Sequence, residues 1–185
     1  MNRLTFEQVT SSRFGLAYWE PLVDGRPVRG LLHDPDATGQ VGEREHVGPA
    51  GESVPVLVHN WPVAGTDGAE ELLGRKPSAL PGGRVALYVC SVCGDAGCGV
   101  VSAAVEWSEA TVVWREFGWD TDWDDGEDDI RFEGGPFVFD REQYEGELLR
   151  FVETYAAVRA SVPAYPASAA PSVRPTRRSW WPWSR

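Results

Sequence analysis

The sequence predicts an α+β fold in which an antiparallel β-sheet packs against a long C-terminal helix. Three observations support this prediction. The longest apolar segments lie between Arg84 and Trp119 and form three strand-like runs separated by turns, a central three-stranded meander. An Asp-Gly dipeptide near the N-terminus separates two further apolar runs, as in a β-hairpin. Apolar residues then recur at helical spacing after Asp140.

The N-terminal segment is expected to contribute strands. Residues 4–9 alternate in polarity as a strand does, and apolar runs at residues 14–23 and 27–32 flank Asp24-Gly25. A type I′ turn requires positive φ at both central positions, and Asp-Gly is among the pairs that favour it. We therefore expect a hairpin that turns at Asp24-Gly25.

One short helix is expected in the middle of the chain. After a short strand at residues 54–58, Asp67 and Glu70 have the spacing of a capping box, in which Glu70 reaches back to the Asp67 amide. Gly74 stands where a helix commonly ends with positive φ. These signals place a helix at residues 68–73.

The central strands are expected to be covered on both faces. We expect strands at residues 85–93 and 98–105, joined by a turn at residues 94–97, and a third strand at residues 111–119. Both faces of the first two strands are largely apolar, which is typical of interior strands and not of an edge hairpin with one hydrated face.

The strongest helical pattern is C-terminal. Asp140 is a favourable N-cap, and Gln143 occupies the third helical position of a capping box. The apolar stripe that should pack on the sheet comprises Tyr144, Leu148, Phe151 or Val152, Tyr155 and Val158. A single domain over residues 1–160 is therefore predicted.

Residues 161–185 differ in composition from the rest of the chain. They are rich in Pro, Ser and Ala and end in a basic, tryptophan-rich tip at residues 177–185. This composition predicts a disordered tail. The tip suits weak contact with a membrane surface, insertion into an apolar groove of a partner, or folding back on the acidic body of its own chain.

Charge is distributed unevenly along the chain. There are 17 basic and 28 acidic side chains, and residues 161–185 hold four arginines and no acid, so the first 160 residues have 13 basic against 28 acidic groups, a net charge of −15. Because phosphate contacts need Lys and Arg, this body is not expected to bind nucleic acid, whereas a basic partner would be attracted to it. The alternative is that the acidity only maintains solubility.

The sequence also bears on the cellular compartment. No apolar stretch reaches the roughly 18 residues that a membrane helix needs, and residues 1–13 lack the apolar region of a signal peptide. Three cysteines within nine residues fit a disulfide framework poorly and a reducing compartment well. A cytoplasmic location is expected.

The cysteines form the first candidate site. Cys90-x2-Cys93-Gly94, followed by Cys98, has the pattern of a zinc knuckle, in which a chain reversal points two sulfur atoms the same way. A structural zinc ion usually has four ligands, so the fourth would be His59, His46, Asp95 or water. Two other interpretations stay open: a redox-active dithiol pair, and ordinary small core residues, since free cysteine is often buried. Zinc is the one cofactor that these residues suggest.

An acidic segment forms the second candidate site. Nine acids and one arginine lie between Glu116 and Glu133, which predicts an exposed loop. The aspartates match the first three ligand positions of an EF-hand loop, but the sixth and twelfth positions are Asp125 and Arg131, so only a looser calcium site remains as an alternative. Interleaved tryptophans favour the docking of a basic protein. The predicted partner-binding residues are Trp119, Asp120, Asp122, Trp123, Asp124, Asp125 and Asp128.

Three motifs follow one another in the central and C-terminal parts of the chain. They are Cys90-x2-Cys93-Gly-Asp-x-Gly-Cys98-Gly, Val-Trp-Arg-x-Phe at residues 113–117 and Phe-x-Phe-Asp-Arg-x-Gln-Tyr at residues 137–144. In this combination the chain resembles a family of small bacterial proteins without an established activity, over about residues 84–149. The resemblance implies no catalytic residues and no mechanism, and the tail falls outside it.

The sequence holds no recognisable catalytic constellation, such as a nucleophile motif, a phosphate-binding glycine loop or a His-Glu-x-x-His helix. We therefore expect a binding protein and not an enzyme, comparable to an immunity or adaptor protein, that engages a basic protein partner through the acidic loop. The alternative is a zinc-binding or thiol-dependent protein centred on Cys90, Cys93 and Cys98. The oligomeric state is not specified by the sequence.

Overall fold

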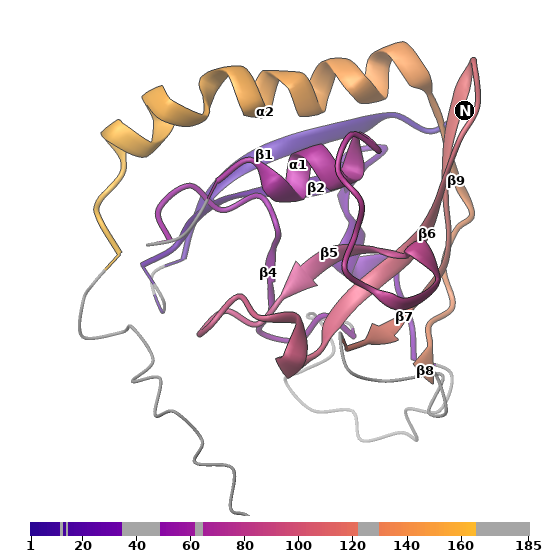
Figure 1. Cartoon of the computed structure of the whole chain (residues 1–185), viewed down its shortest axis with the longest axis horizontal. Coiled ribbons are helices and arrows are strands. Elements are labelled where there is room, and N and C mark those ends of the chain that lie inside the picture. Colours follow the sequence, from indigo (N-terminus) through magenta and orange to yellow (C-terminus); the bar gives the residue numbers. More distant parts are fainter. Residues whose placement is uncertain (12, 14, 35–48, 62–64, 122–129, 166–185) are drawn as a thin grey trace, which may run out of the picture.

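The structure is a computed structural model of the chain that describes residues 1–11, 13, 15–34, 49–61, 65–121 and 130–165. The described chain forms two antiparallel sheets and a long C-terminal helix (Figure 1). The predicted α+β class is confirmed. Within the described residues, no helix combines the length and the apolar character needed to cross a membrane.

The strands form two sheets. In chain order the elements are β1 (Leu4–Thr10), β2 (Ala17–Val23), β3 (Arg26–Pro27), β4 (Val54–Pro55), α1 (Asp67–Leu72), β5 (Val85–Val89), β6 (Val100–Trp107), β7 (Thr111–Asp120), β8 (Ile130–Arg131), β9 (Phe137–Asp140) and α2 (Arg141–Ser161). One sheet has the order β1-β2-β3, and the other has the order β4-β5-β6-β7-β8 with β9 also paired to β7. The sheets meet where the Trp19 amide donates to the Leu57 carbonyl at 2.9 Å.

The predicted turn at Asp24-Gly25 is present, but its hairpin belongs to the smaller sheet. Asp24 and Gly25 have φ of 51° and 77°, as a type I′ turn requires. The Asp24 carboxylate accepts hydrogen bonds from the Arg3 amide at 2.8 Å and from the Asn2 side chain at 2.7 Å. These bonds hold the turn against the start of β1. The second strand is shorter than expected, because a 3₁₀ helix begins at Val28.

The predicted meander of β5, β6 and β7 is present, with two corrections. β5 ends at Val89 and not at residue 93, and residues 90–99 form an irregular connection that includes a 3₁₀ helix. Gly94 and Gly99 have φ of 67° and 89° there, which is incompatible with a continuing ladder. β7 extends to Asp120, so the first part of the acidic segment is strand and not loop.

The short helix α1 lies one residue earlier than predicted. Its N-cap is Thr66, which makes no side-chain cap hydrogen bond, so the predicted capping box is wrong. Asp67 instead pairs with Lys76 at 2.7 Å. Gly74 follows the helix with φ of 68°, which confirms its predicted position.

The C-terminal helix α2 begins where the sequence predicts. The Asp140 carboxylate accepts a hydrogen bond from the Gln143 amide at 3.0 Å. The Gln143 side chain does not complete the capping box. It donates to the Leu4 carbonyl at 2.6 Å and accepts from the Leu4 amide at 3.2 Å, so α2 is tied to β1 (Figure 1). The buried residues of the stripe are Tyr144, Leu148 and Phe151.

A buried hydrogen-bond chain joins both helices to the larger sheet. The Trp114 indole on β7 donates to the Tyr144 hydroxyl at 3.2 Å, and that hydroxyl donates to the Leu72 carbonyl at 2.9 Å. The side chains of Trp114 and Tyr144 are fully buried. Because buried polar groups are costly without partners, this chain favours one relative placement of α1, α2 and β7.

Arg84 and Asp120 form a largely buried ion pair beside β6. Arg84 Nε donates to the Asp120 carboxylate at 2.8 Å and to Ser102 Oγ at 3.0 Å. The two charged side chains are 9% and 13% exposed. The β6–β7 register shifts between Ser102 and Ala104, and the Arg84 guanidinium donates to the nearby Glu116 carbonyl.

We expect Arg84→Met to lower the free energy of unfolding by about 3 kcal/mol or more, because it leaves the Asp120 carboxylate mostly buried without its main partner. Urea unfolding followed by circular dichroism measures this change. The matched control is Arg115→Met, which breaks an ion pair with the exposed Glu106 and should cost less than about 1 kcal/mol. If both variants lowered the free energy of unfolding by the same amount, the buried ion pair of Arg84 and Asp120 would not have this stabilising role.

Candidate metal centre

The three cysteines lie on the connection between β5 and β6. Cys90 directly follows β5, Cys93 lies within the next turn, and Cys98 ends the 3₁₀ helix Ala96–Cys98. The Gly94 amide donates to the Cys90 carbonyl at 2.9 Å, which closes the turn. Because Cys90 and Cys93 do not share a regular strand, their side chains are free to point the same way.

The sulfur atoms of this turn converge. All three Sγ atoms lie within 4.8 Å of one another, and those of Cys93 and Cys98 are 3.2 Å apart. In a tetrahedral zinc site with Zn–S bonds of about 2.3 Å, neighbouring sulfur atoms are about 3.8 Å apart. The 4.8 Å limit allows this spacing, and the 3.2 Å between Cys93 and Cys98 is somewhat shorter than it, so the three sulfur atoms could occupy three corners of a tetrahedral site after a small movement.

Backbone N–H groups are directed at two of these sulfur atoms. Burial alone would raise the pKa of Cys90, but the N–H groups of Cys93 and Val92, together with the two other thiols, hold it below its usual value. Burial raises the pKa of Cys93 to about 12, against the N–H of Asp95, and the neighbouring sulfur atoms add to that rise. N–H contacts of this kind stabilise thiolates, the form in which cysteine binds metal ions.

Two tryptophan rings pack closely against glycines of the cysteine turn, Trp61 against Gly94 and Trp119 against Gly99. A Cβ atom at Gly94 would lie 2.3 Å from the Trp61 ring, and one at Gly99 would lie 2.2 Å from the Trp119 indole. Both glycines also have positive φ. Glycine is therefore needed at both positions, for the backbone conformation and for the close approach of the rings.

The cysteines are not core residues. Cys90 and Cys93 are partly exposed, and Cys98 is exposed. The interpretation of the three as ordinary small core residues is therefore wrong. The metal and dithiol interpretations, which need access to the sulfur atoms, agree with this exposure.

Among the residues that the structure describes, neither His59 nor Asp95 joins the cysteine cluster as a fourth ligand. His59 is fully buried and stacks on Tyr155 with 5.5 Å between ring centroids. The Asp95 carboxylate accepts from the Gly97 amide at 2.7 Å, and His46 lies outside the described residues. Within the described part of the chain the site offers three ligands, which leaves one position for water.

The structure places only two of the predicted partner-binding residues. Trp119 is partly buried against the main hydrophobic core and contacts Gly99, and Asp120 pairs with Arg84. The others, Asp122, Trp123, Asp124, Asp125 and Asp128, lie outside the described residues. Binding of a partner by this segment stays a prediction.

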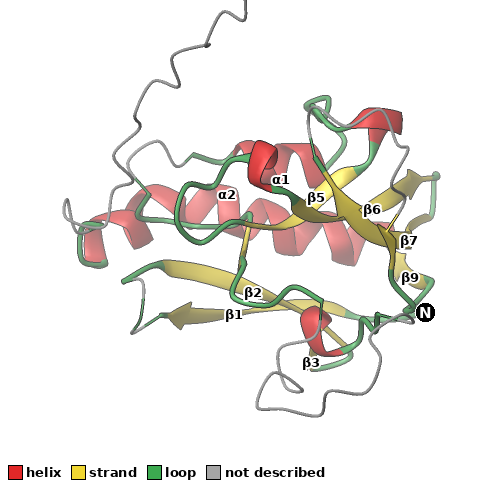
Figure 2. Cartoon of the chain, turned by 90° about the horizontal axis from the view of Figure 1, so that it is seen from below, coloured by secondary structure: helices red, strands yellow, loops and turns green. Residues whose placement is uncertain are grey.

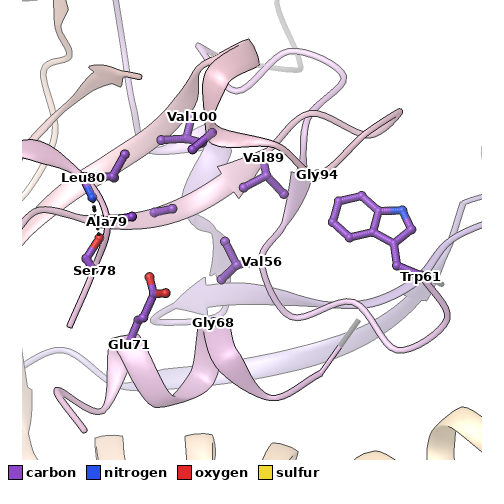
Figure 3. Close-up of a pocket in the computed structure, with 12 residues that line it drawn as sticks. Val56, Trp61, Gly68, Glu71, Ser78, Ala79, Leu80, Val89, Gly94 and Val100 are labelled. Carbon is purple, nitrogen blue, oxygen red and sulfur yellow. Dashed lines mark hydrogen bonds between the residues drawn. The ribbon is translucent and has the colours of Figure 1, made fainter. Parts of the chain in front are cut away.

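A pocket behind the cysteine turn was not predicted. It has a volume of about 220 Å³ and lies between α1, the end of β5 and the start of β6 (Figure 3). Its lining comes from several separate segments, including Val56, Glu71, Leu80 and Val100. No local pattern could have revealed it, because neither spacing nor composition relates these segments.

Comparison of the chain with protein-family models, with curated proteins and with solved structures finds no match. The resemblance of the cysteine and aromatic motifs to a family of small bacterial proteins therefore stays a prediction.

His59 should make folding stability depend on pH. Burial lowers its pKa from 6.5 to about 4, so the unfolded chain takes up the proton first as the pH falls. Stability is then fully present above about pH 6.5 and decreases by about 3 kcal/mol as the pH falls to about 4. We expect His59→Phe to remove this part of the pH dependence, measured as the difference from the wild type in urea unfolding.

The control for this experiment is His33→Gln, because His33 is exposed to solvent. That variant should keep the wild-type dependence between about pH 6.5 and 4. If the free energy of unfolding of His59→Phe changed with pH as it does in the wild type, His59 would not contribute to the pH dependence.

Proposed function

We propose that this protein binds one zinc ion through Cys90, Cys93 and Cys98. The observation that supports the proposal is the convergence of the three sulfur atoms within 4.8 Å of one another. N–H groups of the same turn face two of these atoms. Thiolates are preferred ligands of zinc. The N–H groups help to lower the pKa of Cys90, and at Cys93 the N–H of Asp95 opposes the rise that burial causes without overcoming it.

The bound ion would cross-link the connection between β5 and β6. Three thiolates leave one tetrahedral position, which water fills in our proposal. The connection spans residues 90–99, so a link among residues 90, 93 and 98 would restrict most of its length. A structural site of this kind stabilises folding, since the unfolded chain lacks a preformed site.

A dithiol pair is the competing interpretation of the same residues. Cys93 and Cys98 are close enough to form a disulfide with a small movement. A reactive thiol usually has a cationic neighbour that lowers its pKa. For Cys90 and Cys93, the influences on the pKa are burial, N–H groups and the other sulfur atoms, with no cation among them. This environment favours metal binding over redox chemistry.

Metal analysis of protein purified without chelator should give about one zinc per chain, with thiols that react with a disulfide reagent only after chelation or unfolding. Cobalt substitution should give a thiolate charge-transfer band. Cys93→Ser should weaken metal binding by about 100-fold or more, because it removes a ligand.

The matched control is Val92→Ser, which introduces the same side chain at an exposed position of the same turn and should keep the metal. Metal-free protein whose thiols react in the folded state would contradict the zinc proposal and favour the dithiol interpretation.

A second proposal concerns the acidic segment and a basic protein partner. The segment leaves β7 at Asp120 and returns at β8, and these strands pair at Gly118–Arg131 and Trp119–Ile130. Its two ends are therefore held together at one end of the sheet. The net charge of −15 over the first 160 residues favours a basic partner.

Charge reversal of the segment should abolish capture of such a partner from a lysate of the native cells, because electrostatic attraction is lost. The variant replaces Asp122, Asp124, Asp125 and Asp128 with Lys. The control reverses four exposed acids elsewhere, Glu7, Glu109, Glu142 and Glu153. Loss of capture in both variants would indicate dependence on net charge and contradict a specific role for the segment.

A further inference from the structure

The pocket behind the cysteine turn has a mostly apolar wall and one acidic group. Val56, Leu80, Val89 and Val100 form much of the wall. Figure 3 shows the Glu71 carboxylate rising from α1 at one end and the Trp61 ring at the other. The cysteines are not among the lining residues, but Gly94 and Ala96 of the same turn are, so the pocket shares one wall with the proposed metal centre.

Glu71 is half-buried and supplies the one carboxylate among the residues that line the pocket. The cation that acts on its carboxylate is Lys76, whose ammonium group lies 2.7 Å from the Asp67 carboxylate. In the described part of the chain no hydrogen bond is formed by the Glu71 carboxylate. Burial raises the pKa of this group, and the Lys76 charge opposes the rise only in part. A partly desolvated carboxylate gains from a bound cation.

We propose that this pocket binds a small arylalkylammonium ion, with the ammonium group at Glu71 and the aromatic ring between the apolar wall and Trp61. A cavity of about 150 Å³ holds a benzene molecule. The volume of about 220 Å³ therefore accommodates a phenyl ring with a two-carbon ammonium chain. Ring contact with Trp61 and burial against the valines supply the apolar part of the affinity.

The charge of the pocket excludes other ligand classes. An anion would be repelled by Glu71. A neutral aromatic molecule would remove water from the carboxylate without supplying a positive charge, which costs free energy. Only a ligand with a cationic group at the α1 end satisfies both parts of the pocket.

The test is calorimetric titration of the full chain with 2-phenylethylammonium, with its neutral analogue 2-phenylethanol as the comparison. We expect submillimolar binding of the ammonium ion and binding of the alcohol that is weaker by about tenfold or more. Glu71→Gln should weaken ammonium binding by about tenfold or more and leave alcohol binding within about twofold.

The control is Glu70→Gln, which removes a neighbouring charge on α1 outside the pocket lining and should keep the wild-type affinity. If Glu71→Gln does not fold, Ala86→Leu is used instead, because it adds bulk to the lining while keeping the carboxylate; it should abolish binding. Equal affinities for ammonium and alcohol, unchanged binding in Glu71→Gln or Ala86→Leu, or no binding by the wild type would overturn the proposal.

Discussion

The pairing of β7 with its neighbours is the constraint on which the rest of the structure depends. β7 pairs with β6, β8 and β9 and carries the fully buried Trp114. β9 ends at Asp140, the N-cap of α2, so the pairing of β7 with β9 determines where α2 begins. At its other end, β7 places Trp119 against Gly99 and so supports the cysteine turn. The positions of the helix and of the candidate metal centre both follow from this strand.

The sequence predicts those elements whose geometry is determined by nearby residues. The turn at Asp24-Gly25 depends on positive φ at two adjacent positions, and the start of α2 depends on one carboxylate and an amide three residues later. The apolar stripe of α2 has the period of the helix that it forms. In each case cause and effect lie within one turn of the chain. Figure 2 shows how the long helix, predicted in this way, lies alongside both sheets.

The remaining features depend on contacts between distant residues or on competing local signals. The hydrogen bonds between the Gln143 side chain and the Leu4 backbone join residues 139 positions apart, and no sequence pattern predicts them. At the end of β5, the apolar alternation continues beyond Val89 and predicts a longer strand. The chain instead turns at Gly94, which has a positive φ, and the strand does not continue. The cysteine pattern itself indicated that the strand ends before Cys93, since a zinc knuckle requires a chain reversal between Cys90 and Cys93.

The cysteine turn lacks the packing that stabilises the rest of the larger sheet. Between Cys90 and Gly99, only Ser91 and Gly99 are buried, so burial of apolar side chains contributes little there. Two tryptophan rings hold the turn through contacts with its glycines. The pocket adjoins the turn, with Gly94 and Ala96 in its lining. A metal ion bound by three thiolates would supply the missing cross-link, because its bonds are made to the turn itself and need no additional buried surface. The region with the fewest buried side chains in this sheet connection is therefore the one where a metal cross-link would stabilise the fold most.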